Sequence, residues 1–261
     1  QACMHVGQTQ DHDGSDQTGG IVTIQHNSFI GQIQDHPQGS SPKALVLRNT
    51  ERIVVDDNSQ NAIVIVAGAN GALTPAVLGC FDAALQEADV IICQLEIPDA
   101  TVGHALKRGR ELGKTVILNP APASRPLPQE WYASIDYLIP NESEAAALSG
   151  LPVDSLQTAQ IAATRLIDMG AGKVIITLGA QGSLFADGKG FEHFPAPSVK
   201  ALDTTAAGDT FVGGFAAALV AGMSEAQAIR FGQVGAALSV TRAGAQPSIP
   251  TLADVQAFKT P

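Results

Sequence analysis

Residues 89–118 read DVIICQLEIPDATVGHALKRGRELGKTVIL, and this stretch indicates the fold. It opens with the β-branched run Val90-Ile-Ile-Cys93, which is typical of a buried strand. A helical pattern follows from Asp99 to Leu112 and ends at Gly113. A second apolar run, Thr115-Val-Ile-Leu118, comes directly afterwards. A strand, a helix and a strand in this order predict two parallel strands joined by a crossover helix.

The same alternation continues downstream. After a Pro-rich loop at Asn119–Pro128, the run Tyr137-Leu-Ile139 predicts a strand and then a helix that ends at Gly150. A longer helix near 155–169 leads into the strand Lys173–Thr177. Repeated β-α-β units predict an α/β fold, with a mainly parallel sheet covered by helices on both faces. Ligands bind beyond the carboxyl ends of such strands. The residues found there are Glu96, Asn119, Asn141 and Gly179.

The N-terminal part of the chain has a different character. Arg52–Asp56 and Ala62–Ala67 flank a polar turn, which predicts a β-hairpin outside the main sheet. Residues 1–50 hold 8 Gln, 6 Gly and 4 of the 6 His, without strand or helix periodicity. Because such a stretch cannot easily bury one face, we expect loop or disorder over it.

Composition excludes several classes of protein. The net charge of −10 argues against a nucleic-acid backbone as partner. Cys3, Cys80 and Cys93 are odd in number and far apart, which disfavours a disulfide scaffold or a zinc site and fits a reducing cytosol. No apolar run approaches the ~20 residues of a membrane span. These features predict a soluble, cytoplasmic protein.

The segment Asp203-Thr-Thr-Ala-Ala-Gly-Asp209-Thr-Phe211 carries the strongest indication of chemistry. It joins an extended run, Val199–Leu202, to a small-residue helix predicted over Thr210–Ala221. A helix start offers unpaired N–H groups and a positive dipole end to an anion. Asp209 there indicates a base beside an anion hole. The alternative is an ordinary N-cap Asp after a tight turn.

Two other segments follow strands. Thr177–Gly182 is a glycine loop, which is either a nucleotide contact or a tight turn between strands. Asn141-Glu-Ser-Glu144 opens a helix, and its spacing fits a capping box. The chain has no G-x-x-x-x-G-K-[ST] motif, so a P-loop is not expected.

These segments together resemble the ribokinase-like family of sugar kinases from about Arg52 to the C-terminus. The segments that carry the resemblance are Gln94–Glu96, Asn119–Ala123, Pro140–Glu144, Thr177–Gly182, Asp203–Phe211 and Val240–Pro250. The resemblance implies a three-layer α/β/α fold with a small β lid. It divides the chain into an atypical segment, 1–51, and a kinase domain, 52–261. The hairpin at 52–67 would be part of the lid, which such proteins use in homodimer contacts.

The resemblance also implies roles for individual residues. Asp209 would be the catalytic base, with an anion hole at Ala206, Ala207 and Gly208. The implied ATP-binding residues are Asn141, Thr177, Leu178, Gly179, Ala180, Gln181, Gly182, Gly208 and Gln233, although Gln233 could equally be a surface residue. Glu96 and Asp209 would contact the sugar, and Glu144 would place Mg²⁺ through water. A K⁺ ion would be held, mostly by backbone carbonyls, at Asp203, Thr205, Ser239, Arg242, Gly244 and Ser248.

The activity implied is ATP-dependent phosphorylation of D-ribose at its 5-hydroxyl. Alternatives are a related sugar or deoxyribose kinase, or a catalytically silent product that still binds nucleotide. The last alternative arises because residues 1–50 lack the Asn-x-Asp and Gly-Gly-Lys segments with which the family holds its sugar. We hypothesise a truncated or frame-disrupted product with foreign sequence before the kinase body. Each missing charge-assisted hydrogen bond would weaken sugar binding by roughly 1.5–3 kcal/mol.

Overall fold

The computed structural model describes residues 21–25, 29–30, 44–48, 52–57, 60–65 and 68–258 except 124, with side chains from residue 69 onward. The chain divides into two compact units, 1–73 and 74–261. The smaller and the larger unit are considered separately below.

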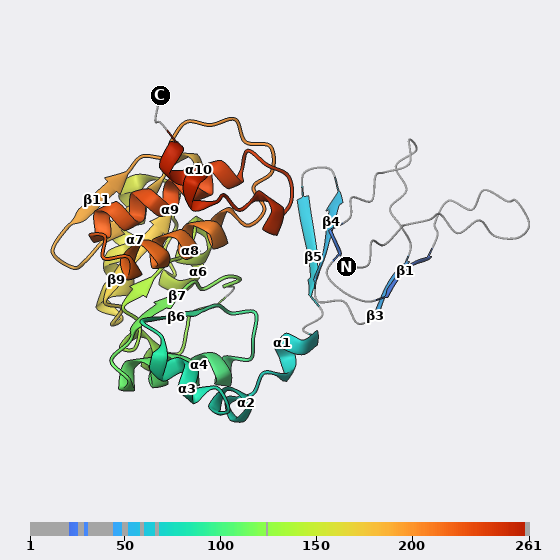
Figure 1. The fold of residues 1–261 in the computed structure, drawn as a ribbon, viewed down its shortest axis with the longest axis horizontal. Coiled ribbons are helices and arrows are strands. Elements are labelled where there is room, and N and C mark those ends of the chain that lie inside the picture. Colours follow the sequence, from blue (N-terminus) through green and yellow to red (C-terminus); the bar gives the residue numbers. More distant parts are fainter. Residues whose placement is uncertain are drawn as a thin grey trace, which may run out of the picture. The chain divides into compact units, whose positions relative to one another are not determined.

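The larger unit is built around a six-stranded sheet with the strand order β11-β10-β9-β8-β7-β6 (Figure 1). Strands β6, β7, β8 and β9 run parallel to one another, whereas β10 is antiparallel to both β9 and β11. The bounds are β6 Val90–Cys93, β7 Thr115–Leu118, β8 Tyr137–Leu138, β9 Lys173–Thr177, β10 Ser183–Ala186 and β11 Phe191–Phe194. The predicted mainly parallel sheet is therefore confirmed.

Helices occupy the connections between these strands and the C-terminal part of the unit. They are α2 Pro75–Gly79, α3 Asp82–Glu87, α4 Asp99–Glu111, α5 Gln129–Tyr132, α6 Glu142–Ser149, α7 Leu156–Asp168, α8 Ala207–Val220, α9 Glu225–Ser239 and α10 Leu252–Ala257, with 3₁₀ turns η1 Gly179–Gln181 and η2 Gln246–Ser248. Ser155 and Ser224 begin α7 and α9 because each side chain accepts the amide of the third helical residue. Within the described ranges, no helix has the length and apolar character needed to cross a membrane.

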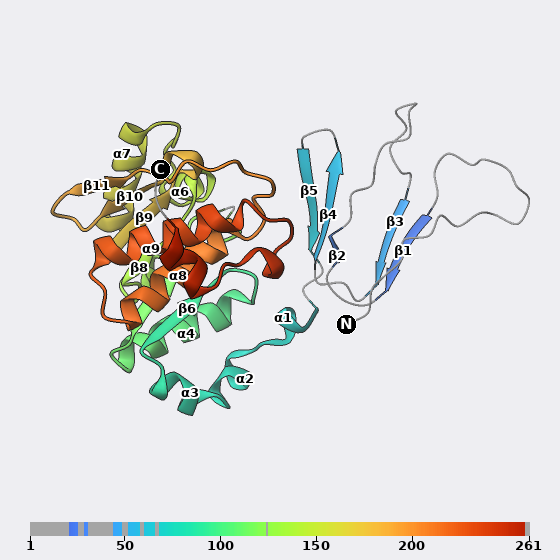
Figure 2. The same cartoon turned by 45° about the horizontal axis from the view of Figure 1, so that its top comes forward.

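The two faces of the sheet pack against different helices (Figure 2). Successive residues of a strand point to opposite faces, so Ile117 and Leu118 of β7 belong to different core clusters. Leu118 packs in the cluster that contains buried residues of α4, α6 and α7. Ile117 packs in the cluster that contains Phe211 and Phe215 of α8 and Ile229 of α9. Each such buried side chain stabilises the fold by about 1.5–3 kcal/mol. The result is the expected three-layer α/β/α arrangement.

Helices α8 and α9 approach closely at two glycines. A Cβ atom at Gly232 would lie 2.7 Å from the carbonyl oxygen of Phe211, and one at Gly214 would lie 3.1 Å from the Cα of Gly232. Only residues without a Cβ permit this spacing between the two backbones. The packing with α9 therefore constrains the position of α8, whose first turn holds Asp209.

The smaller unit contains short strands and one short helix. Strands β4 (Arg52–Asp57) and β5 (Gln60–Ile65) form an antiparallel hairpin in a separate sheet of the order β2-β4-β5, which confirms the hairpin predicted outside the main sheet. Strand β2 (Phe29–Ile30) pairs parallel to β4, and β1 (Ile21–Gln25) pairs parallel to β3 (Ala44–Arg48). Helix α1 spans Gly68–Ala72.

Three of these strands differ from the expectation for residues 1–50. β1, β2 and β3 lie within the segment for which we predict loop or disorder, and each is only two to five residues long. Single apolar runs such as Ala44-Leu-Val-Leu47 are too short to show a period in the sequence. The remainder of that segment lies outside the described residues, so the domain boundary at 51/52 stays a prediction.

The extended run predicted at Val199–Leu202 forms no strand. Leu202 is exposed, and its amide, like that of Asp203, donates to the carbonyl of Val240 instead of to a neighbouring strand. The residues before α8 are thus tied to the segment that follows α9. The run forms no strand because no described strand lies beside it to pair with. The local sequence pattern does not show whether such a partner is present.

Candidate active site

The start of α8 is shaped by Ala206, which adopts a left-handed conformation with φ 60°. Ala206 is the N-cap residue, and its short side chain makes no capping hydrogen bond. Its carbonyl accepts the amide of Thr210 at 2.9 Å and the Thr210 hydroxyl at 2.7 Å. A left-handed alanine costs roughly 1–2 kcal/mol, and such strained residues often occur at functional sites.

The first turn of α8 leaves amides available for an anion. Gly208 and Asp209 are exposed, and their N–H groups have no acceptor within the part of the chain that the structure describes. A Cβ atom added at Gly208 would meet nothing within 4 Å, so the space above this turn is open. Unpaired amides and the helix dipole together favour binding of a phosphate.

Asp209 is not a capping residue. It is the third residue of α8, whereas the N-cap is Ala206, so the alternative of an ordinary N-cap Asp is wrong. The Asp209 carboxylate is exposed and has no described hydrogen-bond partner. It is therefore free to accept a proton from a molecule bound at the helix start.

A second carboxylate, Glu144, lies near Asp209. Glu144 is 7% exposed, and burial raises its pKa above the usual range. The amide of Asn141 lowers the pKa in part, and the negative charge of Asp209 raises it further. The carboxylates at the starts of α6 and α8 therefore interact electrostatically. Two repelling carboxylates of this kind suit a divalent cation.

Asn141 and Glu144 form the capping box that the spacing predicts. Asn141 Oδ1 accepts the Glu144 amide at 2.8 Å, and Glu144 Oε2 accepts the Asn141 amide at 2.9 Å. The Asn141 Nδ2 group and the Glu144 Oε1 atom have no described partner. Capping therefore fixes both side chains and leaves one polar atom on each for a ligand.

The glycine loop after β9 folds as the 3₁₀ turn η1 and leads into β10. The Leu178 amide donates to the carbonyl of Gly182 at 2.8 Å, and Gly182 has φ 96° and ψ −126°, a conformation reserved for glycine. Thr177 pairs with Asn141 in an isolated parallel bridge. This bridge places the loop beside the start of α6, so two of the predicted nucleotide-binding segments are neighbours.

Gly182→Ala should disrupt this loop. The added Cβ would lie 1.9 Å from the carbonyl oxygen of Phe194, and we expect a loss of roughly 2–5 kcal/mol in the free energy of unfolding. Gly179→Ala is a matched control, because φ is 53° there and nothing lies within 4 Å of its Cβ position. Its cost should be only about 1–2 kcal/mol. Urea denaturation of both variants measures the difference, and equal losses would contradict the predicted clash.

Gln233 is buried, with 7% of its surface exposed, so the alternative that it is a surface residue is wrong. Its Nε2 group donates to the carbonyl of Phe194 at 2.7 Å and to Ser183 Oγ at 3.2 Å. Gln233 thus joins α9 to β10 and β11 behind the glycine loop. A nucleotide contact through its nitrogen would have to share these partners.

Asp203 ties together the two segments predicted to hold a monovalent cation. Its Oδ1 accepts the Thr205 amide at 2.9 Å, and its Oδ2 accepts the Gly244 amide at 2.8 Å. The hydrogen bonds from Thr205 and then Gly244 lower the pKa of Asp203, which keeps it anionic. The Arg242 guanidinium pairs with Asp254 at 3.3 Å, so its carbonyl is the group left for a cation. Ser239 and Ser248 are buried, and each hydroxyl donates to a carbonyl three residues earlier.

Glu96 lies in the loop after β6 and is half-buried. This loop is joined to the loop after β7 by the Leu95 amide, which donates to the carbonyl of Ala121 at 3.0 Å. The residues that follow β6, β7 and β8 are thus adjacent along one edge of the sheet. Asn119 belongs to this set, although the sequence alone gave it no role.

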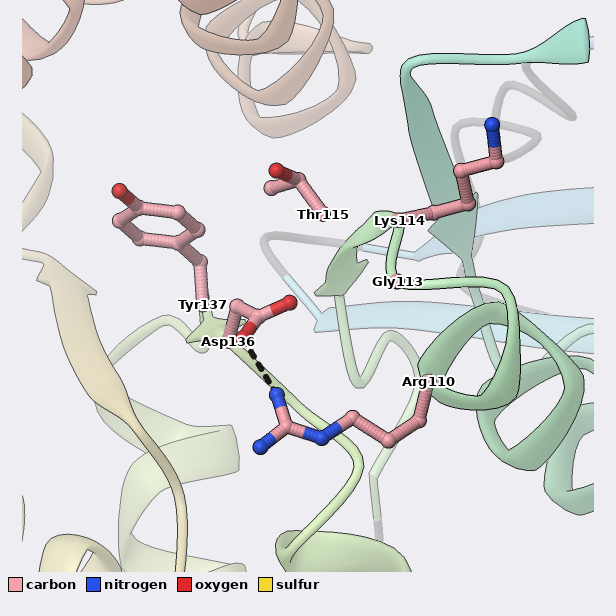
Figure 3. A pocket seen from close by; sticks show the side chains of 6 residues that line it. All are labelled: Arg110, Gly113, Lys114, Thr115, Asp136 and Tyr137. Carbon is pink, nitrogen blue, oxygen red and sulfur yellow. Dashed lines mark hydrogen bonds and ion pairs between the residues drawn. The ribbon is translucent and has the colours of Figure 1, made fainter.

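A cavity of about 330 Å³ lies at the opposite ends of the parallel strands, their amino ends (Figure 3). Its lining is Arg110, Gly113, Lys114, Thr115, Asp136 and Tyr137, at the amino ends of β7 and β8. The Arg110 guanidinium points to Asp136 at 3.2 Å, and Asp136 also accepts the Val116 amide. None of the predicted site residues lines this cavity.

The fold and the site beyond the carboxyl ends of the parallel strands define a class of protein. A helix start with free amides, an adjacent carboxylate and a second carboxylate at the start of another helix are features of enzymes that transfer phosphoryl groups. The model of the pfkB family of carbohydrate kinases matches residues 46–252. The chain therefore belongs to the pfkB carbohydrate kinase family.

Individual relatives agree with this assignment. The chain is 42% identical to a ribokinase of Staphylococcus aureus over 205 residues, which are 78% of this chain and 67% of that protein. It is 44% identical to a ribokinase of Haemophilus influenzae over 207 residues, 79% of this chain and 67% of that protein. The structure of Arabidopsis thaliana ribokinase complexed with ribose and ATP superposes with a TM-score of 0.75 at 28% identity, and covers 89% of this chain and 82% of that one. The chain thus spans about two thirds of the length of these bacterial relatives.

Proposed function

We propose that this chain transfers the γ-phosphoryl group of ATP to the 5-hydroxyl of D-ribose. The observation that carries the proposal is the first turn of α8, where free amides at Gly208 and Asp209 adjoin the unpartnered Asp209 carboxylate. Membership of a carbohydrate kinase family and the ribokinase relatives support the substrate class.

The proposed reaction uses the geometry of α8 directly. The sugar hydroxyl oxygen bonds to the γ-phosphorus while the bond from that phosphorus to the β–γ bridging oxygen breaks, and ADP leaves. Asp209 accepts the hydroxyl proton late in the transfer, so its orientation matters more than its basicity. The free amides of Gly208 and Asp209 stabilise the charge on the transferring group, whereas the Ala207 amide already donates to the carbonyl of Thr204.

The nucleotide would be held by the segments after β8 and β9. The unpartnered Asn141 Nδ2 group is a donor for a phosphate oxygen, and the glycine loop at Thr177–Gly182 lies beside it. Glu144 would hold a hydrated Mg²⁺ ion, which neutralises phosphate charge when bound. Burial raises the pKa of Glu144, the negative charge of Asp209 raises it further, and this electrostatic interaction between two carboxylates supports the assignment.

We propose a K⁺ site between the Asp203–Thr205 segment and the segment after α9. The anionic Asp203 links both segments through backbone amides, which supports a cation among their carbonyls. We also propose a cytoplasmic location, in accordance with the free thiols of Cys80 and Cys93. The β4–β5 hairpin would contribute to a contact between two copies of the chain.

Glu144→Gln should increase the Mg²⁺ concentration required for nucleotide binding. Gln keeps an oxygen that can accept the Asn141 amide, so the capping box and α6 should persist. The lost charge should raise the Mg²⁺ requirement about 10-fold, equivalent to ~1.4 kcal/mol of cation binding. Calorimetric titration of ATP at several Mg²⁺ concentrations measures this shift. Glu142→Gln removes a carboxylate from the same turn and is the control, and an unchanged requirement in Glu144→Gln would count against the Mg²⁺ role.

The function itself is tested by ADP production with ribose, 2-deoxyribose, fructose or no sugar, at Mg²⁺ saturation and with K⁺ present or absent. We expect production that depends on ribose and increases with K⁺. Higher ADP production with 2-deoxyribose than with ribose would identify 2-deoxyribose as the substrate. ATP binding without sugar-dependent ADP production at any ribose concentration would instead identify a catalytically silent nucleotide-binding chain.

A further inference from the structure

Asn119 occupies the first position beyond β7 and continues the geometry of that strand. Its amide donates to the carbonyl of Cys93 at 2.9 Å, and the amide of Ile139 donates to the carbonyl of Leu118 at the same distance. The residue is therefore held on both sides by the neighbouring strands. Only 7% of its surface is exposed.

The strand pleat determines which face Asn119 occupies. Leu118 packs in the cluster on the α4 and α7 face, whereas Ile117 packs with Phe211 and Phe215 of α8. Residues two apart on a strand share a face. Asn119 thus lies on the α8 face of the sheet, one step nearer the carboxyl edge than Ile117.

Asn119 is 7% exposed as a residue, and its side-chain amide has no hydrogen-bond partner among the described residues. Among those residues the Tyr132 hydroxyl is the one side-chain polar atom that is fully enclosed without a partner, so the amide of Asn119 reaches the surface of the site. A mostly buried residue that presents an unpartnered amide beyond the carboxyl end of a parallel strand is well placed to contact a bound ligand.

The position of Asn119 indicates which part of the ligand it meets. Glu96 follows β6 on one side, and Asn141 and Glu144 follow β8 on the other. Asn119 thus lies between the proposed sugar contact on one side and the proposed nucleotide contacts on the other. Helix α8 packs on the same face of the sheet as Asn119. We infer that Asn119 Nδ2 donates a hydrogen bond to an oxygen of the phosphoryl group during its transfer from ATP to the sugar. This inference rests on the proposed function.

A donor to the transferring group acts mainly in the transition state, so its removal should affect turnover more than nucleotide affinity. The test uses ADP binding with Mg²⁺, measured with and without aluminium fluoride, which mimics the transferring phosphoryl group. Wild-type protein should bind ADP more tightly when aluminium fluoride is present. Asn119→Ala should lose about 10²-fold of that gain, while affinity for ADP alone changes less than about 2-fold.

Asn119→Asp is the second variant, because it is nearly isosteric and folds even if the smaller Ala does not fill the site. It exchanges the donor for a carboxylate, which should abolish the gain completely. Gln129→Ala removes an amide that donates to the carbonyl of Met169, away from the predicted site residues, and should keep the whole gain.

Three results would overturn the inference. Full enhancement by aluminium fluoride in both Asn119 variants would exclude a contact with the transferring group. If the variants lost affinity for ADP without aluminium fluoride by the same factor as with it, Asn119 would have a structural role in the nucleotide site. Failure of the wild-type chain to bind ADP at all would overturn the proposed function, and the inference with it. This outcome is distinguished from the other two because it appears in the wild-type protein, without any variant.

Discussion

Asp209→Asn is expected to reduce ribose-dependent ADP production by about 10²–10⁴-fold, the contribution typical of a positioned proton acceptor. The amide cannot accept the hydroxyl proton, although it has almost the same shape as the carboxylate. Because the Asp209 side chain has no described partner within the protein, its replacement should leave the fold and the start of α8 unchanged. Steady-state kinetics with ribose and ATP varied separately measure the effect.

The binding of ATP separates a chemical role of Asp209 from a structural one. Affinity for MgATP in Asp209→Asn should remain near the wild-type value, since the Asp209 side chain is assigned to the sugar hydroxyl and the substitution leaves the backbone amides of α8 and the segments after β8 and β9 in place. The pKa of Glu144 should also fall, because the charge of Asp209 contributes to its elevation. Retained turnover in the variant would remove Asp209 as the base, whereas lost nucleotide binding would indicate a structural role.

The fold was largely accessible from the sequence because its elements are bounded by local signals. Helix α4 ends where Gly113, with φ 67°, permits a left-handed turn, and α6 ends in the same way at Gly150. Capping side chains at Ser155 and Ser224 mark the starts of α7 and α9. Short β-branched runs that alternate with helices bounded in this way predict parallel strands.

The start of α8 could not be located from the sequence in the same way. We predict a helix from Thr210, but it begins at Ala207 because Ala206 takes a left-handed conformation that glycine or asparagine would ordinarily provide. This difference matters for function, since it decides which amides are free. The segment before Ala206 is tied to the residues after α9 by the hydrogen bond from the Gly244 amide to Asp203, a long-range contact that local sequence patterns do not reveal.

Long-range burial was also beyond the reach of local patterns. Gln233 lies on a helix of mixed composition, and only the packing of α9 over β10 and β11 buries it against Phe194. Asn119 follows a strand, as the sequence indicates, but its burial to 7% exposure depends on the neighbouring segments of the tertiary fold. A polar residue directly after a buried parallel strand was the available signal, and it was not specific enough to assign a role.

Gly208→Val should abolish turnover without destabilising the protein. The first turn of α8 has open space above Gly208, and a Cβ added there meets nothing within 4 Å, so we expect the fold to accommodate the larger side chain. That same space is where a phosphoryl group must approach the amides of Gly208 and Asp209. A branched side chain would hold the anion away from these donors, and the loss of one such donor alone reduces kcat by about 10²–10³-fold.

Gly213→Val in the same helix is the matched control. Gly213 is also exposed and also has nothing within 4 Å of its Cβ position, yet it lies more than one turn from the helix start. Both variants should unfold at a temperature close to that of the wild-type protein, and only Gly208→Val should lose ribose-dependent ADP production. If Gly208→Val retained full turnover, the phosphoryl group could not approach the first turn of α8. The proton acceptor and the anion-binding amides would then have to be sought elsewhere in the protein.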